Sequence, residues 1–430
     1  MPQSVSAARA WILLALLGGL YLLSFIDRFI LALLVTPLKG ELGLTDLQLG
    51  LLFGTFFAVF YGLAGIPLAR LADRSNRKRI IIAGVVVWSA CTITSAFAQN
   101  FTTLAFLRFG LAIGEAALTP AALSMLTDAF EPRRRVLAGS LYTATGMFGG
   151  ATAFGVSALV LGVAQDVASY IDLSAWRIAL IAVGTPGLFL ALVFGLTCRE
   201  PDREVEVQRV PLAGVVKYLV QHGRLYGGIF AASGTGHLLT FAMLAWSATL
   251  LERSYLVSVQ EAGTLLSIAH VCSNVGGTLL VPIALRAIAQ RRPALAGYGP
   301  AIAIAFGMPL VIVSLQLPTA ISFLAVSATG LFFVSGAINS NLVLLQSIAP
   351  SRMRATLTSL FLICISTFAL GLGPPLAAAA ARLFGESDDI ATGITALGIA
   401  SMFLAVAAFA VAAAPLGRAF SRTLVDKKPE

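Results

Sequence analysis

Charged residues are scarce in this sequence. Only 11% of its 430 residues are Asp, Glu, Lys or Arg, whereas 58% are hydrophobic, and the mean hydropathy is +0.90. A soluble domain carries about 25% charged residues. So few polar side chains cannot cover a water-exposed surface, and lipid must cover the rest. The composition therefore excludes a soluble globular fold.

The sequence also lacks the patterns of an enzyme site. Its four cysteines form neither a disulfide framework nor a zinc-ligand spacing. There is no nucleophile-elbow motif and no phosphate-binding loop. We therefore expect neither an enzyme nor an ATP-driven pump, and no cofactor apart from a proton as coupling ion.

Basic residues exceed acidic ones, for a net charge of +9, but they do not form a nucleic-acid surface. They fall in short clusters between apolar runs and not along one polar face. We expect a lipid bilayer as the partner, and no nucleic acid.

Twelve apolar runs are long enough to cross a membrane, which needs roughly 20 residues. Backbone groups must be paired within lipid, so each run is predicted to be a helix. The runs are 10–37, 47–69, 80–98, 101–127, 136–164, 176–197, 225–250, 260–285, 294–315, 319–348, 355–383 and 390–415. The first run follows only Arg9 and has no convincing cleavage site, so we interpret it as a retained helix.

The basic clusters predict the orientation of these runs, because cytoplasmic loops are enriched in Lys and Arg. Clusters follow every even-numbered run, for example 70–79, 133–135 and 286–292, whereas the opposite loops carry mainly acids. Both termini are therefore predicted to be cytoplasmic, in a multi-pass protein of the plasma (inner) membrane.

The longest polar stretch lies near the middle of the chain and separates two similar halves. The segment 130–135 opens the fifth run, and the similar segment 349–354 opens the eleventh. Transporters are commonly built from such repeats, with the substrate site between them. We predict a six-helix bundle over 1–198, a cytoplasmic linker over 199–223 and a second bundle over 224–430, in a monomer.

The loop after the second run, ARLADRSNRK at 69–78, resembles the signature loop of the major facilitator superfamily. That signature reads Gly-x-Leu-Ala-Asp-Arg-x-Gly-Arg-Lys, and Ala69 and Asn76 replace its glycines here. The resemblance implies a twelve-helix transporter and assigns Asp73, Arg74 and Arg77 to a cytoplasmic gate. A charge run that only sets the topology is the alternative.

Four further segments resemble the spinster-like branch of this superfamily. They are SFIDR at 24–28, LRFGLAIGEA at 107–116, REPDR at 199–203 and GLGPP at 371–375. The branch is associated with proton-linked export of lysolipids and sphingolipid-type lipids. Leu372 departs from many eukaryotic members, which carry an acid there, so the exact substrate stays open.

Ionisable residues inside membrane spans are costly and usually functional. Four stand out: Asp27, Arg28, Arg108 and Glu115. Arg108 and Glu115 share one helix face about two turns apart, and Asp27 lies at a comparable depth. We interpret Asp27 and Glu115 as proton-coupling residues, and Arg108 and Arg28 as binding an anionic head group. A static ion network is the alternative, and Arg28 could instead snorkel outward.

The second half offers mainly neutral polar groups in its runs, including His237 and His270. A substrate cavity between the two halves would have one charged wall and one apolar wall. Such a cavity suits an amphiphile better than a sugar. We therefore predict a proton-coupled transporter of a lysophospholipid or sphingolipid type of molecule. A broad-specificity drug or organic-anion exporter is the alternative, and the buried charges argue against a non-transporting receptor or scaffold.

Overall fold

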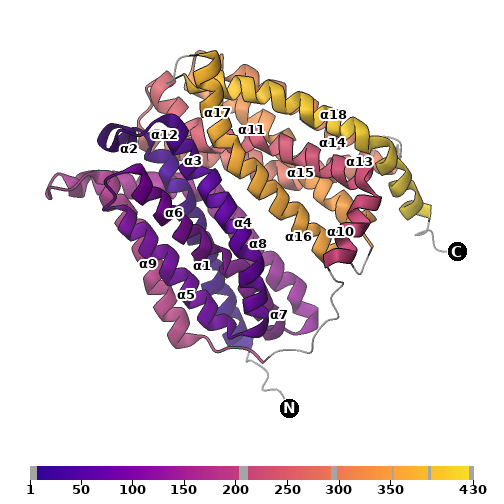
Figure 1. Ribbon diagram of the computed structural model, residues 1–430, viewed down its shortest axis with the longest axis horizontal. Helices are drawn as coiled ribbons and strands as arrows, with labels where there is room; N and C mark the ends of the chain where they lie inside the picture. Colours follow the sequence, from indigo (N-terminus) through magenta and orange to yellow (C-terminus); the bar gives the residue numbers. More distant parts are fainter. Residues whose placement is uncertain (1–6, 203–211, 292–297, 351–352, 386–388, 426–430) are drawn as a thin grey trace. The chain divides into compact units, whose positions relative to one another are not determined.

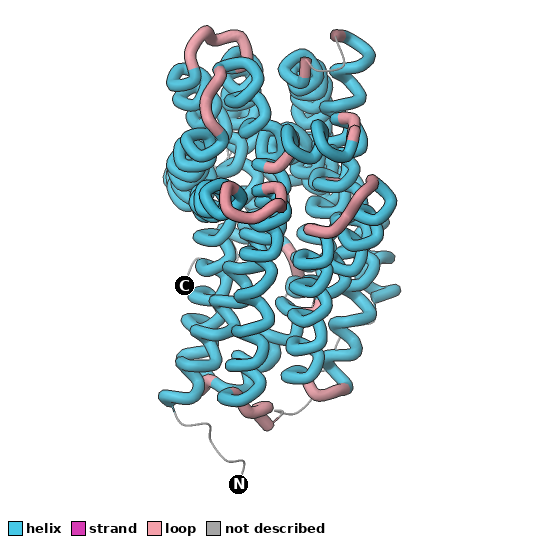
Figure 2. The backbone as a smooth tube through the Cα atoms, turned by 90° about the vertical axis from the view of Figure 1, so that its left-hand side faces the viewer, coloured by secondary structure: helices cyan, strands magenta, loops and turns pink. Residues whose placement is uncertain are grey.

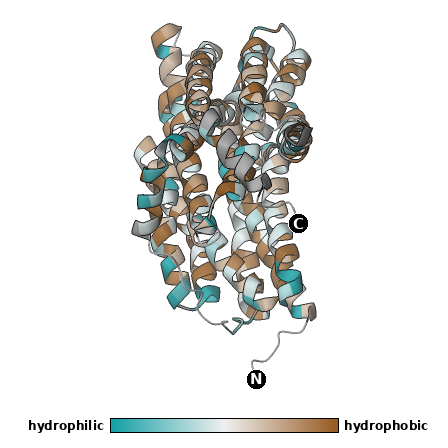
Figure 3. Ribbon diagram, turned by 90° about the vertical axis from the view of Figure 1, so that its right-hand side faces the viewer, coloured by the Kyte–Doolittle hydropathy of each residue, from teal (hydrophilic) through white to brown (hydrophobic). Residues whose placement is uncertain are grey.

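The computed structural model describes residues 7–202, 212–291, 298–350, 353–385 and 389–425. Nearly all of this described chain is helical and none of it is β-strand (Figure 2). Eleven of the helical segments are long and apolar enough to cross a membrane. Figure 3 shows apolar residues along most of their length. The predicted all-helical membrane fold is thus confirmed.

Two compact units are distinguished in the chain (Figure 1). The first unit comprises residues 1–206 and 251–268, and the second comprises 207–250 and 269–430. The helices of residues 1–206 are α1 (Ala7–Leu33), α2 (Val35–Leu42), α3 (Asp46–Phe53), α4 (Thr55–Arg74), α5 (Arg77–Ser95), α6 (Phe101–Ala116), α7 (Leu118–Ala129), α8 (Pro132–Ala168) and α9 (Ala175–Thr197).

The fourth predicted span is broken at Ala117, two residues after Glu115. Helix α6 ends at Ala116, and α7 begins at Leu118. Pro120 has no N–H to donate to the carbonyl of Ala116, so a continuous helix would lose that hydrogen bond. The break places Glu115 in the last turn of α6.

The remaining helices are α10 (Leu212–Gln221), α11 (Gly223–Tyr255), α12 (Val259–His270), α13 (Gly276–Arg291), α14 (Gly299–Ser314), α15 (Ala320–Ile348), α16 (Arg354–Ile365), α17 (Gly371–Phe384) and α18 (Ile390–Val425). Two π-helical turns, Val271–Val275 and Ser366–Leu370, interrupt the eighth and eleventh spans. Helix α14, in the place of the ninth predicted span, has 16 residues and is shorter than each of the eleven segments that could cross a membrane.

Paired glycines bring neighbouring helices together at corresponding places in the two units. A Cβ added to Gly84 would lie 2.6 Å from the carbonyl oxygen of Gly114, and the reverse distance is also 2.6 Å. Gly307 and Gly330 show the same reciprocal 2.6 Å approach between α14 and α15. Small residues allow such close helix packing. The recurrence between the third and fourth and the ninth and tenth spans supports an internal duplication.

Candidate functional site

The four ionisable residues predicted within spans gather between α1 and α6 of the first unit. Asp27 and Arg28 lie in α1, and Arg108 and Glu115 lie in α6. The Arg108 guanidinium donates to the backbone carbonyl of Arg28 over 3.4 Å. The two helices thus bring the four residues into one cluster, in which Arg28 and not Arg108 is the partner of Glu115.

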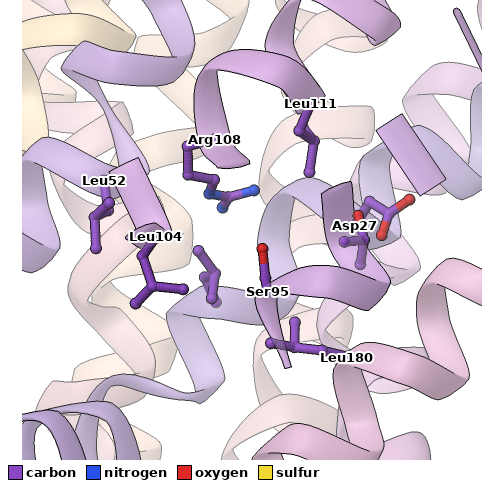
Figure 4. Close-up of a pocket in the computed structure, with 9 residues that line it drawn as sticks. Asp27, Leu52, Ser95, Leu104, Arg108, Leu111 and Leu180 are labelled. Carbon is purple, nitrogen blue, oxygen red and sulfur yellow. The ribbon is translucent and has the colours of Figure 1, made fainter. Parts of the chain in front are cut away.

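Asp27 and Arg108 line one small cavity (Figure 4). Asp27 is 2% exposed and Arg108 is 4% exposed. Figure 4 shows the side chains of Arg108 and Ser95 directed into the space that Asp27 also borders. The cavity measures about 10 Å³, which is close to the room that one water molecule needs. In the part of the chain that the structure describes, Asp27 and Arg108 form no direct ion pair.

Glu115 is paired with Arg28 and not with Arg108. The Arg28 Nη2 lies 2.5 Å from the Glu115 Oε2, and the Glu115 side chain is only 1% exposed. Arg28 therefore does not snorkel outward: its side chain is 15% exposed and turns into the protein. A charge-assisted bond of this length is among the stronger protein hydrogen bonds.

Three aromatic rings surround the Arg28 guanidinium. Its central carbon lies 5.0 Å from the ring centre of Phe25, 4.4 Å from that of Phe57 and 5.5 Å from that of Tyr61. A cation over an aromatic face is attracted by the ring quadrupole, most strongly where water is excluded. Sequence reasoning missed this role, but the i, i+4 spacing of Phe57 and Tyr61 places both rings on one face of α4.

The cluster keeps spare hydrogen-bonding capacity. Its two acids and two bases balance in charge, which limits the cost of burial. Nevertheless one buried polar atom of each residue has no protein partner: Asp27 Oδ1, Arg28 Nε, Arg108 Nε and Glu115 Oε1. Such atoms cost free energy unless another group satisfies them. The arrangement can therefore accept a proton at a carboxyl or an anion at a guanidinium.

A second ion network lies where α4 and α5 meet. Arg77, 1% exposed, donates through Nε to Glu200 over 2.7 Å and through Nη2 to the carbonyl of Pro201 over 2.8 Å. Its Nη1 also pairs with Asp128. Glu200 accepts from the backbone N–H of Lys78 over 2.8 Å, so a carboxylate satisfies the first turn of α5.

Other predicted gate residues are less enclosed. Asp73 is half-buried and Arg74 is exposed, both in the last turn of α4. Sequence reasoning singled out Arg77 but missed the roles of Asp128 and Glu200, which lie 51 and 123 positions away. Glu200 lies in the spinster-like segment 199–203, and this resemblance was the feature of the sequence that could have pointed to its role.

The buried polar groups of the second unit are neutral. Asn341 donates to the Ser233 hydroxyl over 3.0 Å, and His237 Nδ1 lies 3.0 Å from the Ser233 carbonyl oxygen. Among the residues described in this unit, no Asp, Glu, Lys or Arg is buried. The charge asymmetry expected between the halves is therefore present in the described chain.

Comparison with known proteins decides the family. The model of the Major Facilitator Superfamily matches residues 17–374 of this chain. The chain belongs to the Major Facilitator Superfamily. It is therefore a multi-pass integral membrane protein of a transporter family, and this family does not consist of enzymes.

Within the Major Facilitator Superfamily, the chain is similar to spinster proteins. A crystal structure of a bacterial homolog to the human lysosomal transporter Spinster, inward-facing and unoccupied, shares 26% identity and a TM-score of 0.83. That match covers 99% of each chain. The protein spinster homolog 3 of Danio rerio is 26% identical over 59% of this chain and 51% of its own length. The resemblance to the spinster-like branch is confirmed.

Another relative is an efflux pump. An MFS-type efflux pump of Mycolicibacterium smegmatis is 28% identical over 66% of this chain and 64% of its own length. This chain thus spans 51% and 64% of the lengths of the two named relatives.

Proposed function

We propose that this protein is a secondary transporter that moves an amphiphilic, lipid-like molecule across the inner membrane by alternating access, coupled to protons. A lysophospholipid or a sphingolipid-type molecule is the substrate class. The observation that carries the proposal is the cluster of Asp27, Arg28, Arg108 and Glu115, buried within membrane spans of one unit. The similarity to a bacterial Spinster homolog supports it.

Proton coupling would use the carboxyls of Asp27 and Glu115, and at Glu115 it would act on the pair with Arg28. A proton on Glu115 removes the negative charge that holds Arg28, so Arg28 becomes available to another anion. Arg108, which touches the backbone of Arg28, would then share that anion. Guanidiniums suit a phosphate or sulfate-like head group, because their planar forks bind such oxygens in pairs.

The neutral second unit would receive the apolar part of the substrate. Its buried polar groups are hydroxyls, amides and imidazole among the described residues. In this proposal the helices of 1–198 and 224–430 are the two moving bundles, 199–223 connects them in the cytoplasm, and both termini are cytoplasmic. Asp73, Arg74 and the Arg77 network would close the cytoplasmic side.

A broad-specificity exporter of drugs or organic anions is the second candidate. The 28% identity to an MFS-type efflux pump favours it. Both candidates use the same fold, and they differ in the range of chemically unrelated molecules that the transporter accepts as substrates. A substrate profile that includes many non-lipid drugs would select the exporter.

Reconstitution into liposomes tests the proposal. Purified protein should move a lysophospholipid or sphingosine-type lipid across the bilayer, and an imposed pH gradient should accelerate that movement. Protein-free liposomes are the control. Transport of these lipids at the rate of protein-free liposomes, with and without the gradient, contradicts the lipid substrate.

A further inference from the structure

A larger cavity lies away from the ionisable cluster, at the opposite end of the first unit from the Arg77 network. It measures about 440 Å³, within the range of small-molecule sites. Its wall is mostly apolar and includes Leu33, Leu161 and Val259. The polar lining includes two carboxylates, Glu41 and Glu252. The residues come from segments in or beside the first, fifth, sixth, seventh and eighth spans.

The Glu41 carboxylate is fully engaged by protein donors. It accepts from the Ser174 hydroxyl and the Trp176 indole N–H, each over 2.6 Å, and from Arg177 over 2.7 Å. Partial burial acts to raise the pKa of Glu41, but these three donors together hold it below its ordinary value. Glu41 is thus a structural carboxylate in this wall.

Glu252 differs from Glu41 because no cationic side chain among the described residues pairs with its carboxylate. Its carboxylate accepts from the Thr36 hydroxyl over 2.7 Å. The nearby bases Lys39 and Arg253 pair with Asp46 instead, at 3.3 Å and 2.8 Å. A half-buried carboxylate with one neutral donor therefore faces an apolar cavity. A positively charged group in this cavity would balance the charge of the carboxylate.

We infer that this cavity binds an organic ammonium ion, whose charged nitrogen pairs with Glu252 and whose apolar body lies against Leu33, Leu161 and Val259. The described chain offers no group of three His, Cys, Asp or Glu side chains that could hold a metal. A metal ion would need several such ligands, whereas an ammonium needs one carboxylate and an apolar surface. This inference stands whether or not the Asp27 and Glu115 cluster moves protons.

The test is equilibrium binding of phenethylammonium and of its neutral counterpart 2-phenylethanol to the full chain in lipid nanodiscs. The parent protein should bind the amine about tenfold more tightly than the alcohol, which corresponds to one modest ion pair. Glu252→Gln should remove this preference and leave alcohol binding unchanged. Glu252→Asp keeps the charge and should retain part of the preference.

Glu261→Gln is the matched control, since Glu261 is an exposed carboxylate on α12 of the same unit. It should bind both probes as the parent does. Equal binding of amine and alcohol by the parent overturns the inference. The inference is also overturned if Glu252→Gln still binds the amine more tightly than the alcohol. It is overturned as well if Glu261→Gln loses this preference to the same extent as Glu252→Gln. Should Glu252→Gln fail to fold, complete loss of the preference in Glu252→Asp would also count against it.

Discussion

Two arginines share the buried cluster but hold different partners. Arg28 is bound to Glu115 at 2.5 Å and enclosed by aromatic rings, whereas Arg108 borders a water-sized cavity and donates to a backbone carbonyl. Arg108 is therefore the guanidinium better placed to receive a substrate anion without first losing a strong partner. In the proposed mechanism, Arg108 would therefore bind the head group of the substrate first, and Arg28 would follow once Glu115 is protonated.

Replacement of Arg108 tests this assignment. Arg108→Ala should weaken binding of a phosphate-bearing lysolipid at least about tenfold, and binding of its uncharged counterpart far less, because only the former loses a charge-assisted contact. Arg108→Lys should restore binding in part, since Lys lacks the planar fork. Affinities are measured on purified protein. Equal losses for both lipids would make Arg108 a structural member of the cluster.

Sequence reasoning identified these residues because charge within an apolar run is conspicuous. It did not find the Arg28–Glu115 pair, since the rotation of α1 against α6 depends on tertiary packing and not on either segment alone. Asp27 and Arg28 are neighbours that point about 100° apart. Their spacing alone could not decide which of them faces Glu115.

The helices α5 and α6 meet through glycine, and this contact positions the cluster. Gly114 precedes Glu115 and has no room for a side chain, since an added Cβ would lie 2.6 Å from the Gly84 carbonyl oxygen and 2.8 Å from the Trp88 backbone nitrogen. Both obstacles are backbone atoms, so they cannot rotate away. The last turn of α6 is therefore held against α5.

Gly114→Ala should consequently destabilise the protein by about 1–3 kcal/mol, the usual cost of overpacking. Gly65→Ala is the control, because Gly65 is also helical but an added Cβ meets nothing within 4 Å. The control should leave stability unchanged or raise it slightly. Thermal unfolding in detergent measures both variants. Equal melting temperatures for the two would show that the glycine contact does not constrain α6.

The last turn of α2 carries Glu41, whose contacts should depend on pH. Hydrogen bonds from Ser174, Trp176 and Arg177 outweigh partial burial and lower the pKa of Glu41 in the folded protein. A lowered folded-state pKa contributes stability above the unfolded value of about 4.3 and loses it as the pH falls through the folded value. Glu41→Gln should melt below the parent at pH 6–8.

This difference should narrow as the pH falls below about 4.3. Melting temperatures of parent and Glu41→Gln across pH 3–8 measure it, with Glu261→Gln as the exposed control. A difference that stays constant across this range would mean that the Glu41 charge contributes nothing to the contact.

Helix positions were largely predictable from hydropathy, but the interruptions were not. Eleven of the twelve apolar runs correspond to described segments long enough to cross a membrane, because lipid imposes a simple length rule, whereas the ninth run forms the shorter helix α14. The break before Pro120 and the π-helical turn before Pro374 are changes in the backbone hydrogen-bond pattern of the helix. They depend on which backbone N–H groups have an acceptor in the folded structure. The contacts of Arg77 with Asp128 and Glu200 join positions far apart in sequence, so no local pattern shows them.

At the scale of the whole molecule, charge is distributed unevenly. The first unit buries Asp27, Arg108 and Glu115, and the described part of the second buries only neutral polar groups. A substrate with an anionic head and an apolar tail matches this division. The duplication seen in the glycine pairs Gly84–Gly114 and Gly307–Gly330 therefore preserved the packing but not the charge.

The most direct test of proton-coupled transport compares four proteins in liposomes with an imposed pH gradient: the parent, Asp27→Asn, Glu115→Gln and the control Glu261→Gln. Each substitution keeps the shape of the side chain and removes its ability to exchange a proton. The account predicts that gradient-driven lysolipid flux is lost in Asp27→Asn and strongly reduced in Glu115→Gln, while Glu261→Gln transports as the parent does. Unchanged gradient-driven flux in both Asp27→Asn and Glu115→Gln would contradict it.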